Sequence, residues 1–168
     1  LYTMKLDGSG VRRVTRELGY DGGAFFYPDG TKLVFRASRP KSPADQKEYM
    51  DLLHQGLVQH TEMEIFVCNA DWSDLRQITK LGKANWAPYY LPDKKRIIFS
   101  SNYAASRGYS FNLFMINEDG TGLEKVTADQ TIDSFPMFSP NGKYLVFASN
   151  RFNGGTRDTN LFVAEWVD

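Results

Sequence analysis

The stretch MFSPNGKYLVFASNR, residues 137–151, repeats two earlier stretches of the same chain almost position for position. FFYPDGTKLVFRASR occupies 25–39, and YYLPDKKRIIFSSNY occupies 89–103. In each stretch, aromatic residues precede a proline turn, and an apolar run containing phenylalanine follows it. Recurrence at this length indicates a repeat architecture.

A second phrase fixes the period of the repeat. LYTMKLDGSGVRRVT begins at residue 1, IFVCNADWSDLRQIT at 65, LFMINEDGTGLEKVT at 113 and a truncated copy, LFVAEWVD, at 161. The intervals are 65 − 1 = 64, 113 − 65 = 48 and 161 − 113 = 48 residues. Several landmarks keep one offset in the three full copies: Asp7, Asp71 and Asp119; Pro28, Pro92 and Pro140; Phe35, Phe99 and Phe147.

Each copy reads as four short strands joined by turns. Asp-Gly and Asn-Gly between apolar runs are strong hairpin signals, because glycine accepts positive φ without steric cost. Stacked four-stranded units of this length predict an all-β fold, a β-propeller with antiparallel blades. A parallel solenoid is the alternative, but short hairpin turns cannot join parallel strands. We therefore expect a single domain over 1–168 that holds about three blades.

The middle repeat departs from the glycine pattern. Trp72 and Asp74 replace the two glycines of one turn, and Lys94 replaces the glycine of another. A non-glycine residue in the left-handed region costs roughly 1 kcal/mol. These turns are therefore either reshaped or mildly strained, through a bound partner or through simple drift.

The first interval is 16 residues longer than the others, since 64 − 48 = 16, and we place an insertion at about 40–62. Ser42 and Pro43 suit a helix N-cap and first turn, and Gly56 suits a helix stop. The spacing predicts one helix over 43–55, either as a cap over apolar surface or as a ledge for a partner.

Composition excludes several classes of protein. Twenty basic residues balance twenty acidic ones, so nothing indicates binding to nucleic acid or to an anionic membrane. No apolar stretch approaches the roughly 18 residues that a membrane-spanning helix needs. The chain opens at Leu1 in strand-like sequence, which we interpret as a piece of a longer protein.

The sequence offers no catalytic constellation. Only two histidines exist, both in the insertion, and neither accompanies a nucleophile elbow. His60, Glu62 and Glu64 alternate and would share one face of a strand, so a metal site there is an alternative to a solvated strand edge. No phosphate-binding or dinucleotide fingerprint exists, so no cofactor is predicted. Cys68 aligns with Met4 and Ile116, which predicts a buried apolar residue.

Some polar residues recur at fixed offsets around the inner strand of each repeat. Asp21, Asn85 and Asp133 precede it, and we interpret them as structural links between blades. Arg39, Tyr103 and Arg151 follow the next strand, where they either support the architecture or line a binding face. Residues that do not recur are the better binding candidates, and Trp86 and Tyr109 are placed in loops. The candidate partner-binding set is therefore Trp86, Tyr109, Arg39, Tyr103 and Arg151.

Together, DSFPMFSPNGKYLVFASNR, NLFVAEW and LFMINEDGTGLEKVT resemble the WD-like propeller repeat of the TolB family over nearly the whole chain outside the insertion. The middle copy departs from the pattern at Lys94, Trp72 and Tyr103. The resemblance implies a bacterial, six-bladed propeller that is often periplasmic or otherwise extracytoplasmic. It also implies a non-catalytic protein-binding domain or, in other relatives, an accessory propeller that screens substrates for a hydrolase or peptidase.

Three functional hypotheses follow. The first is a non-enzymatic module that binds a protein partner, and the second is the accessory propeller of an enzyme whose catalytic domain lies elsewhere. Sugar binding in the channel through aromatic residues is the third. Three blades would also expose apolar blade faces, so we expect that two copies close a six-bladed ring as a homodimer.

Overall fold

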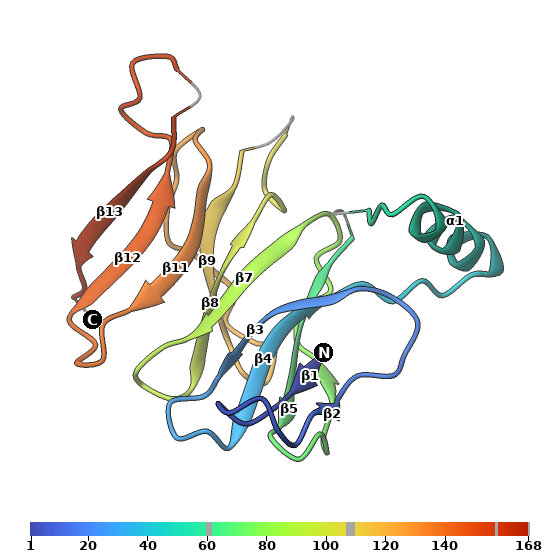
Figure 1. The fold of residues 1–168 in the computed structure, drawn as a ribbon. Helices are drawn as coiled ribbons and strands as arrows, with labels where there is room; N and C mark the ends of the chain where they lie inside the picture. The colour runs from blue at the N-terminus through green and yellow to red at the C-terminus, as the bar shows by residue number, and fades with distance from the viewer. Residues whose placement is uncertain (60–61, 107–109, 157, 168) are drawn as a thin grey trace.

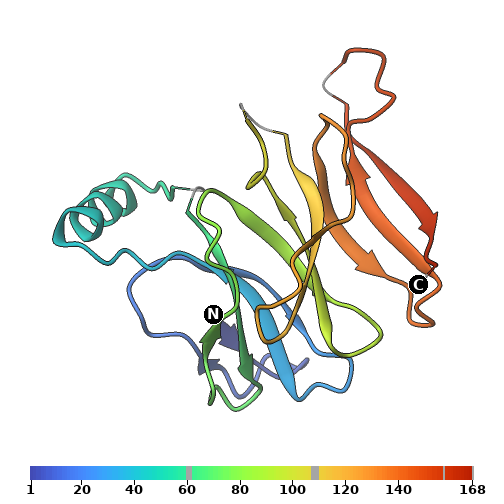
Figure 2. The same ribbon diagram turned by 180° about the vertical axis from the view of Figure 1, so that it is seen from behind.

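The computed structural model describes residues 1–59, 62–106, 110–156 and 158–167. The strands form four antiparallel sheets that stand side by side in an arc (Figure 1), and the view from behind shows the same order (Figure 2). This is the predicted partial β-propeller: two complete blades flanked by two incomplete ones.

The blades follow the order of the chain. The first sheet is the pair β1 (Tyr2–Thr3) and β2 (Arg12–Arg13). The second holds β3 (Asp21–Phe26), β4 (Lys32–Ala37), β5 (Glu64–Asn69) and β6 (Arg76–Gln77). The third holds β7 (Asn85–Tyr90), β8 (Arg96–Ser101), β9 (Asn112–Asn117) and β10 (Glu124–Lys125). The last holds β11 (Asp133–Phe138), β12 (Tyr144–Ser149) and β13 (Asn160–Glu165). We call these sheets blades 0 to 3.

The innermost strand of each of blades 1 to 3 carries a bulge at one repeat position. The pairing register shifts between Gly22 and Phe25 in β3, and at the same offset in β7 and β11. Gly23, Ala87 and Phe135 occupy the bulge with φ of 60°, 48° and 52°. Only the first is glycine, so the fold imposes the left-handed backbone on the other two.

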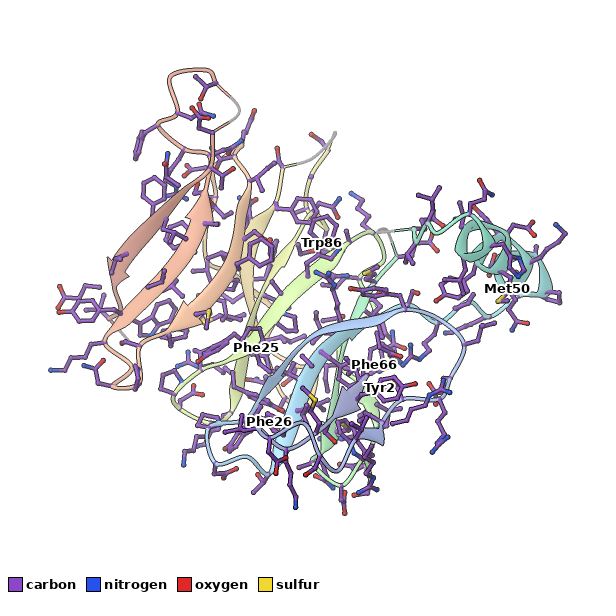
Figure 3. All side chains as sticks on the ribbon, viewed as in Figure 1. Tyr2, Phe25, Phe26, Met50, Phe66 and Trp86 are labelled. Carbon is purple, nitrogen blue, oxygen red and sulfur yellow. The ribbon has the colours of Figure 1, made fainter. Side chains whose placement is uncertain are left out.

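Apolar side chains fill the spaces between neighbouring blades (Figure 3). Val34, Ile65 and Val67 of blade 1 pack on Ile97, Phe99 and other residues of blade 2. Ile98, Leu113 and Met115 of blade 2 pack in the same way on Leu145 and Phe147 of blade 3. β8 and β9 of blade 2 are therefore buried on both faces, which explains their continuous apolar sequence.

The turns that lack glycine keep the shape of the turns that have it. Trp72, Asp74 and Lys94 have φ of 76°, 52° and 61°, close to the values of the glycines at the same offsets. The replacements therefore leave the shape of the turns unchanged and place strain in the backbone of the residues that replace glycine. The turn aspartates also keep one arrangement. At Asp119, the Thr121 hydroxyl and the Thr121 backbone N–H both donate to the carboxylate, and these hydrogen bonds lower the pKa of the carboxyl group.

The predicted helix is present as α1, Pro43–His54. Ser42 caps it with a complete capping box, in which the Ser42 hydroxyl and the Asp45 carboxylate each accept a backbone N–H. None of its residues is buried, and it lies at the blade 0 and blade 1 end of the arc, away from blades 2 and 3 (Figure 1). No described helix is both long and apolar enough to cross a membrane.

Candidate functional site

The arc has two ends along the strand direction. The inner strands β3, β7 and β11 begin at the upper end in Figure 1, where α1 also lies, and finish in proline turns at the lower end. Those of the residues predicted from sequence that the structure describes lie at the upper end, at the starts of β3, β7 and β11 or just after β4, β8 and β12.

In blade 1, Arg39 binds residues of its own blade and of the segment before it. It donates to the carboxylates of Asp21 at 2.5 Å and Glu17 at 2.7 Å, and to the carbonyl oxygen of Ser38 at 2.8 Å. Its guanidinium also lies 5.1 Å from the ring centroid of Phe66. The side chain is largely enclosed, so these contacts favour an architectural role.

Blade 3 repeats this arrangement of an arginine, an aspartate and an aromatic ring, and blade 2 has neutral groups in its place. Arg151 donates to the fully buried Asp133 at 2.8 Å and lies 5.0 Å from the ring centroid of Phe147. In blade 2, the Ser101 hydroxyl donates to the Asn85 side chain at 2.7 Å. The repeated positions therefore tie the inner strand to its neighbour within one blade.

Two of the three inner-strand residues also contact the preceding blade. The Asn85 amide donates to the carbonyl oxygen of Met63 at 2.8 Å and to Glu64 at 3.2 Å. The carbonyl oxygen of Asp133 accepts from the Ser100 hydroxyl at 2.5 Å. The Asp21 carboxylate instead pairs with Arg39 of its own blade.

The placement of Trp86 in a loop is wrong, because Trp86 is the second residue of β7. Its ring stacks on Phe111 at 4.5 Å between centroids, and the Arg36 guanidinium lies 5.8 Å from it. The strand is hard to recognise from the sequence, because Pro88 and the bulge at Ala87 interrupt the usual strand pattern. Tyr103 is exposed and has an edge contact with Phe114, while Tyr109 lies outside the described residues.

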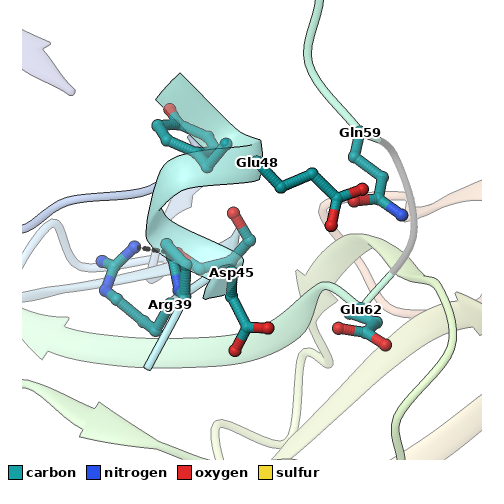
Figure 4. Close-up of a pocket in the computed structure, with 8 residues that line it drawn as sticks. Arg39, Asp45, Glu48, Gln59 and Glu62 are labelled. Carbon is teal, nitrogen blue, oxygen red and sulfur yellow. Dashed lines mark hydrogen bonds between the residues drawn. The ribbon is translucent and has the colours of Figure 1, made fainter. Parts of the chain in front are cut away.

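A polar pocket of about 210 Å³ separates α1 from blade 1. Arg39 lies across it from Glu48, Gln59 and Glu62 (Figure 4). Glu62 has a φ of 57° and precedes β5, so it does not alternate along a strand with Glu64. His60 lies outside the described residues, and within the described ones no cluster of three His, Cys, Asp or Glu side chains could hold a metal ion.

The lower end holds an apolar groove that crosses three blades. Its volume is about 400 Å³, and we call it the proline groove. Each blade contributes the proline of its turn together with aromatic residues just before it. The lining residues are Phe26, Pro28, Tyr89, Tyr90, Pro92, Lys94, Phe138, Ser139 and Pro140.

Contacts between the blades hold the walls of the proline groove in place. Phe25 and Tyr89 meet edge to face at 5.2 Å between centroids, and Tyr27 meets Tyr90 in the same way at 4.8 Å. The Tyr27 hydroxyl donates to the carbonyl oxygen of Lys94 at 3.0 Å, which fixes the strained turn. Lys94 is the one cation among the lining residues.

The sequence interpretation missed the proline groove, although its signal was present. The three prolines and the aromatic residues two positions before them share one offset in every repeat. Only the arrangement of the blades brings these turns together, because they are 64 and 48 residues apart in the chain. The sequence interpretation favoured residues that do not recur as binding candidates. A search for apolar residues that recur at the turns would have found the residues of the groove.

Cys68 is buried, as predicted, and burial raises the pKa of its thiol to about 11. A thiol with this pKa is protonated at neutral pH and is a poor nucleophile. His54 is in the exposed last turn of α1. Cys68 is therefore not an activated nucleophile.

No family model and no curated protein matches the sequence. Among solved structures, a putative TolB from Agrobacterium tumefaciens superposes with a TM-score of 0.71 at 23% identity, over 98% of this chain and 52% of that one. TolB from Acinetobacter baumannii gives 0.70 at 18% identity, over 98% and 34%. A puromycin-hydrolyzing peptidase of Mycobacterium tuberculosis gives 0.61 at 14% identity, over 95% and 23%.

These likenesses confirm the fold. The chain has the TolB-like propeller fold as a partial propeller, and it spans about half the length of the Agrobacterium protein and about a third of the Acinetobacter protein.

Proposed function

We propose that this chain is a non-enzymatic protein-binding module that holds an extended apolar peptide segment in the proline groove. The groove carries the proposal, because its lining is mostly apolar, unlike that of the pocket beside α1, and because three blades build it. Its volume lies in the range of ordinary ligand pockets, roughly 300 to 1,000 Å³.

The chemistry of the lining suits a peptide of low polarity. Aromatic rings and proline rings present flat, rigid apolar surfaces, the kind of lining that recognises extended proline-containing segments elsewhere. Lys94 at the groove adds one positive charge, so a carboxylate at one end of the bound segment would be favoured.

A displayed library of random peptides tests the proposal. We expect selected peptides to be apolar, with an acidic residue at one end. In fluorescence polarisation, Lys94→Glu and Tyr89→Ala weaken the binding of these peptides by about tenfold or more, an energy of roughly 1.4 kcal/mol.

Lys95→Glu is the matched control. It makes the same change of charge at the next residue, which is exposed and does not line the groove. Failure to select any peptide, or selected peptides that bind Lys94→Glu as tightly as the unchanged chain, would contradict the proposal.

An accessory propeller of a larger hydrolase or peptidase is the second candidate. The fold likeness to the Mycobacterium tuberculosis peptidase, of which the chain covers 23%, supports it. The reading frame that encodes the chain distinguishes the two candidates. A neighbouring Ser-His-Asp domain favours the accessory role, and its absence from the full frame rejects that role.

The proposed compartment is extracytoplasmic, and the resemblance to TolB repeats supports this. Fractionation of the source cells with an antibody against the chain tests it. Recovery in the cytoplasmic fraction alone would reject this location.

A further inference from the structure

Arg36 of β4 is a cation without an ionic partner. Among the described residues, its guanidinium donates a single hydrogen bond, to the Tyr20 hydroxyl at 3.3 Å, and its Nε atom is buried without an acceptor. Every acidic residue except Asp168 is described, and none of them forms an ion pair with Arg36. Arg39 and Arg151, by contrast, each pair with two carboxylates. A buried donor without an acceptor costs stability, and the cost is larger in a charged group.

Two aromatic rings lie against the Arg36 guanidinium. Its Cζ atom is 5.5 Å from the ring centroid of Tyr20 and 5.8 Å from that of Trp86, which belongs to blade 2. Trp86 is itself fixed by its stack on Phe111. Such contacts hold a guanidinium in place but leave its charge and its N–H donors unpaired. We call Tyr20, Arg36 and Trp86 the Arg36 site.

The repeat shows that the propeller does not need a cation at this position. Each inner strand pairs with the next strand at one equivalent position near the upper end. These cross-strand pairs are Gly22 with Arg36 in blade 1, Trp86 with Ser100 in blade 2, and Ser134 with Ala148 in blade 3. Blades 2 and 3 fold with small neutral residues where blade 1 has Arg36, so an architectural role does not account for it.

Two glycines of β3 open the Arg36 site toward the inner face of the arc, which β3, β7 and β11 form. A Cβ atom at Gly22 would collide with the Tyr20 hydroxyl, so only glycine allows this placement of Tyr20. A Cβ atom at Gly23 would lie 4.0 Å from Nε and Cζ of Arg36. Gly23 is exposed, as is its counterpart Phe135, so a side chain at this position would project from the inner face beside the guanidinium. Glycine therefore leaves the half-buried Arg36 accessible.

The exposure of the Arg36 site does not come from an end of the chain. Its side chains belong to the segment just before β3, to β4 and to β7, and blades 1 and 2 each have all four strands. In a repeat array each unit contacts only its neighbours, and both units of this interface are present. None of the three residues lines the proline groove, which lies at the opposite end of the inner strands.

We propose that the Arg36 site binds the carboxylate of a flat, apolar ligand at the inner face. A carboxylate accepts two parallel N–H bonds from a planar guanidinium, and the partly buried surroundings strengthen these bonds. The apolar part of the ligand lies along the inner face below the carboxylate, where Trp86 is nearer the upper end and Phe25 is below it (Figure 3). A small aromatic acid and the aromatic C-terminal residue of a peptide share this chemistry.

An NMR titration with benzoate tests the proposal, and benzamide is the neutral ligand of matching shape. We expect benzoate to shift the Nε–H resonance of Arg36 and the indole N–H resonance of Trp86, and benzamide to leave both in place. The expected dissociation constant is on the order of 1 to 10 mM, since benzoate has few atoms. No shift at several times this concentration, or equal shifts with benzamide, would overturn the proposal.

Variants of Arg36 locate the binding. Arg36→Gln removes the charge and is expected to weaken benzoate binding by about tenfold or more, measured at the Trp86 indole. Arg36→Lys keeps the charge but not the planar pair of donors, and is expected to weaken binding by about fivefold. Arg16→Gln, at an exposed arginine outside the site, removes the same charge and is expected to change nothing.

Circular dichroism verifies the fold of each variant, and Arg36→Lys decides the matter if Arg36→Gln does not fold. Benzoate binding that is unchanged in Arg36→Lys, or that weakens equally in Arg16→Gln, would show that Arg36 does not hold the carboxylate.

A peptide arm identifies the source of the carboxylate. The probes are acetylated Ala-Ala-Phe with a free C-terminal carboxylate and the same peptide with a C-terminal amide. If the free peptide binds about tenfold more tightly than benzoate and the amide does not bind, the ligand is the end of a peptide chain. If the free peptide binds no more tightly than benzoate, the ligand is a small free acid. Binding of the amide as tight as that of the free peptide would contradict carboxylate recognition.

Discussion

At the scale of single residues, Lys94 shows how the fold and the proposed function compete. Its backbone is left-handed, a conformation that the neighbouring repeats assign to Gly30 and Gly142, yet its side chain lines the proline groove. A non-glycine residue in this conformation costs stability, and such costs persist where a functional site uses the residue. If Lys94 binds a carboxylate, its strain is the cost of placing a cation at the groove.

Lys94→Gly separates these two roles. We expect the free energy of unfolding to rise by about 0.5 to 1 kcal/mol, because the relieved strain exceeds the added freedom of the unfolded chain. Lys95→Gly, at a neighbouring residue without positive φ, is expected to lower it. Urea unfolding measures both. A loss of stability in Lys94→Gly as large as that in Lys95→Gly would show that the turn is not strained.

At the scale of elements, the repeat made most of the fold predictable. Landmarks in register located the hairpins, and local signals located α1 to within one residue of its end. Trp86 was misplaced because Pro88 interrupts the strand pattern and the bulge at Ala87 is invisible in composition. The proline groove was missed for another reason: its walls come from turns far apart in the chain, so only the stacking of blades assembles it.

The insertion is separable from the propeller in this structure. The connection from β4 to β5 spans residues 38–63, and that from β8 to β9 spans 102–111, so removing 43–58 makes the two equal: 26 − 16 = 10 residues. Since α1 has no buried residue, we expect this deletion to change the free energy of unfolding by less than about 1 kcal/mol.

Chemical denaturation checks the expectation, with Phe99→Ala as the reference. Phe99 is fully buried between blades 1 and 2, and its truncation is expected to cost about 3 to 5 kcal/mol. A deletion variant as unstable as Phe99→Ala would show that α1 is part of the propeller's core.

At the scale of the whole molecule, each blade contacts only its neighbours. Stability in such arrays is roughly a sum of blade and interface contributions, so it is greatest where both faces and both edges are covered. β9 meets this condition, with β8 and β10 at its edges and buried residues along most of its length. Only one edge of β13 is paired, with β12, and most of the side chains of β13 are exposed.

Amide hydrogen exchange should therefore be graded along the arc. We expect amides of β13 to exchange on the order of 100-fold faster than those of β9, because local opening needs less energy where fewer contacts break. Equal protection of β13 and β9 would mean that the uncovered edge and face of β13 do not lower its local stability.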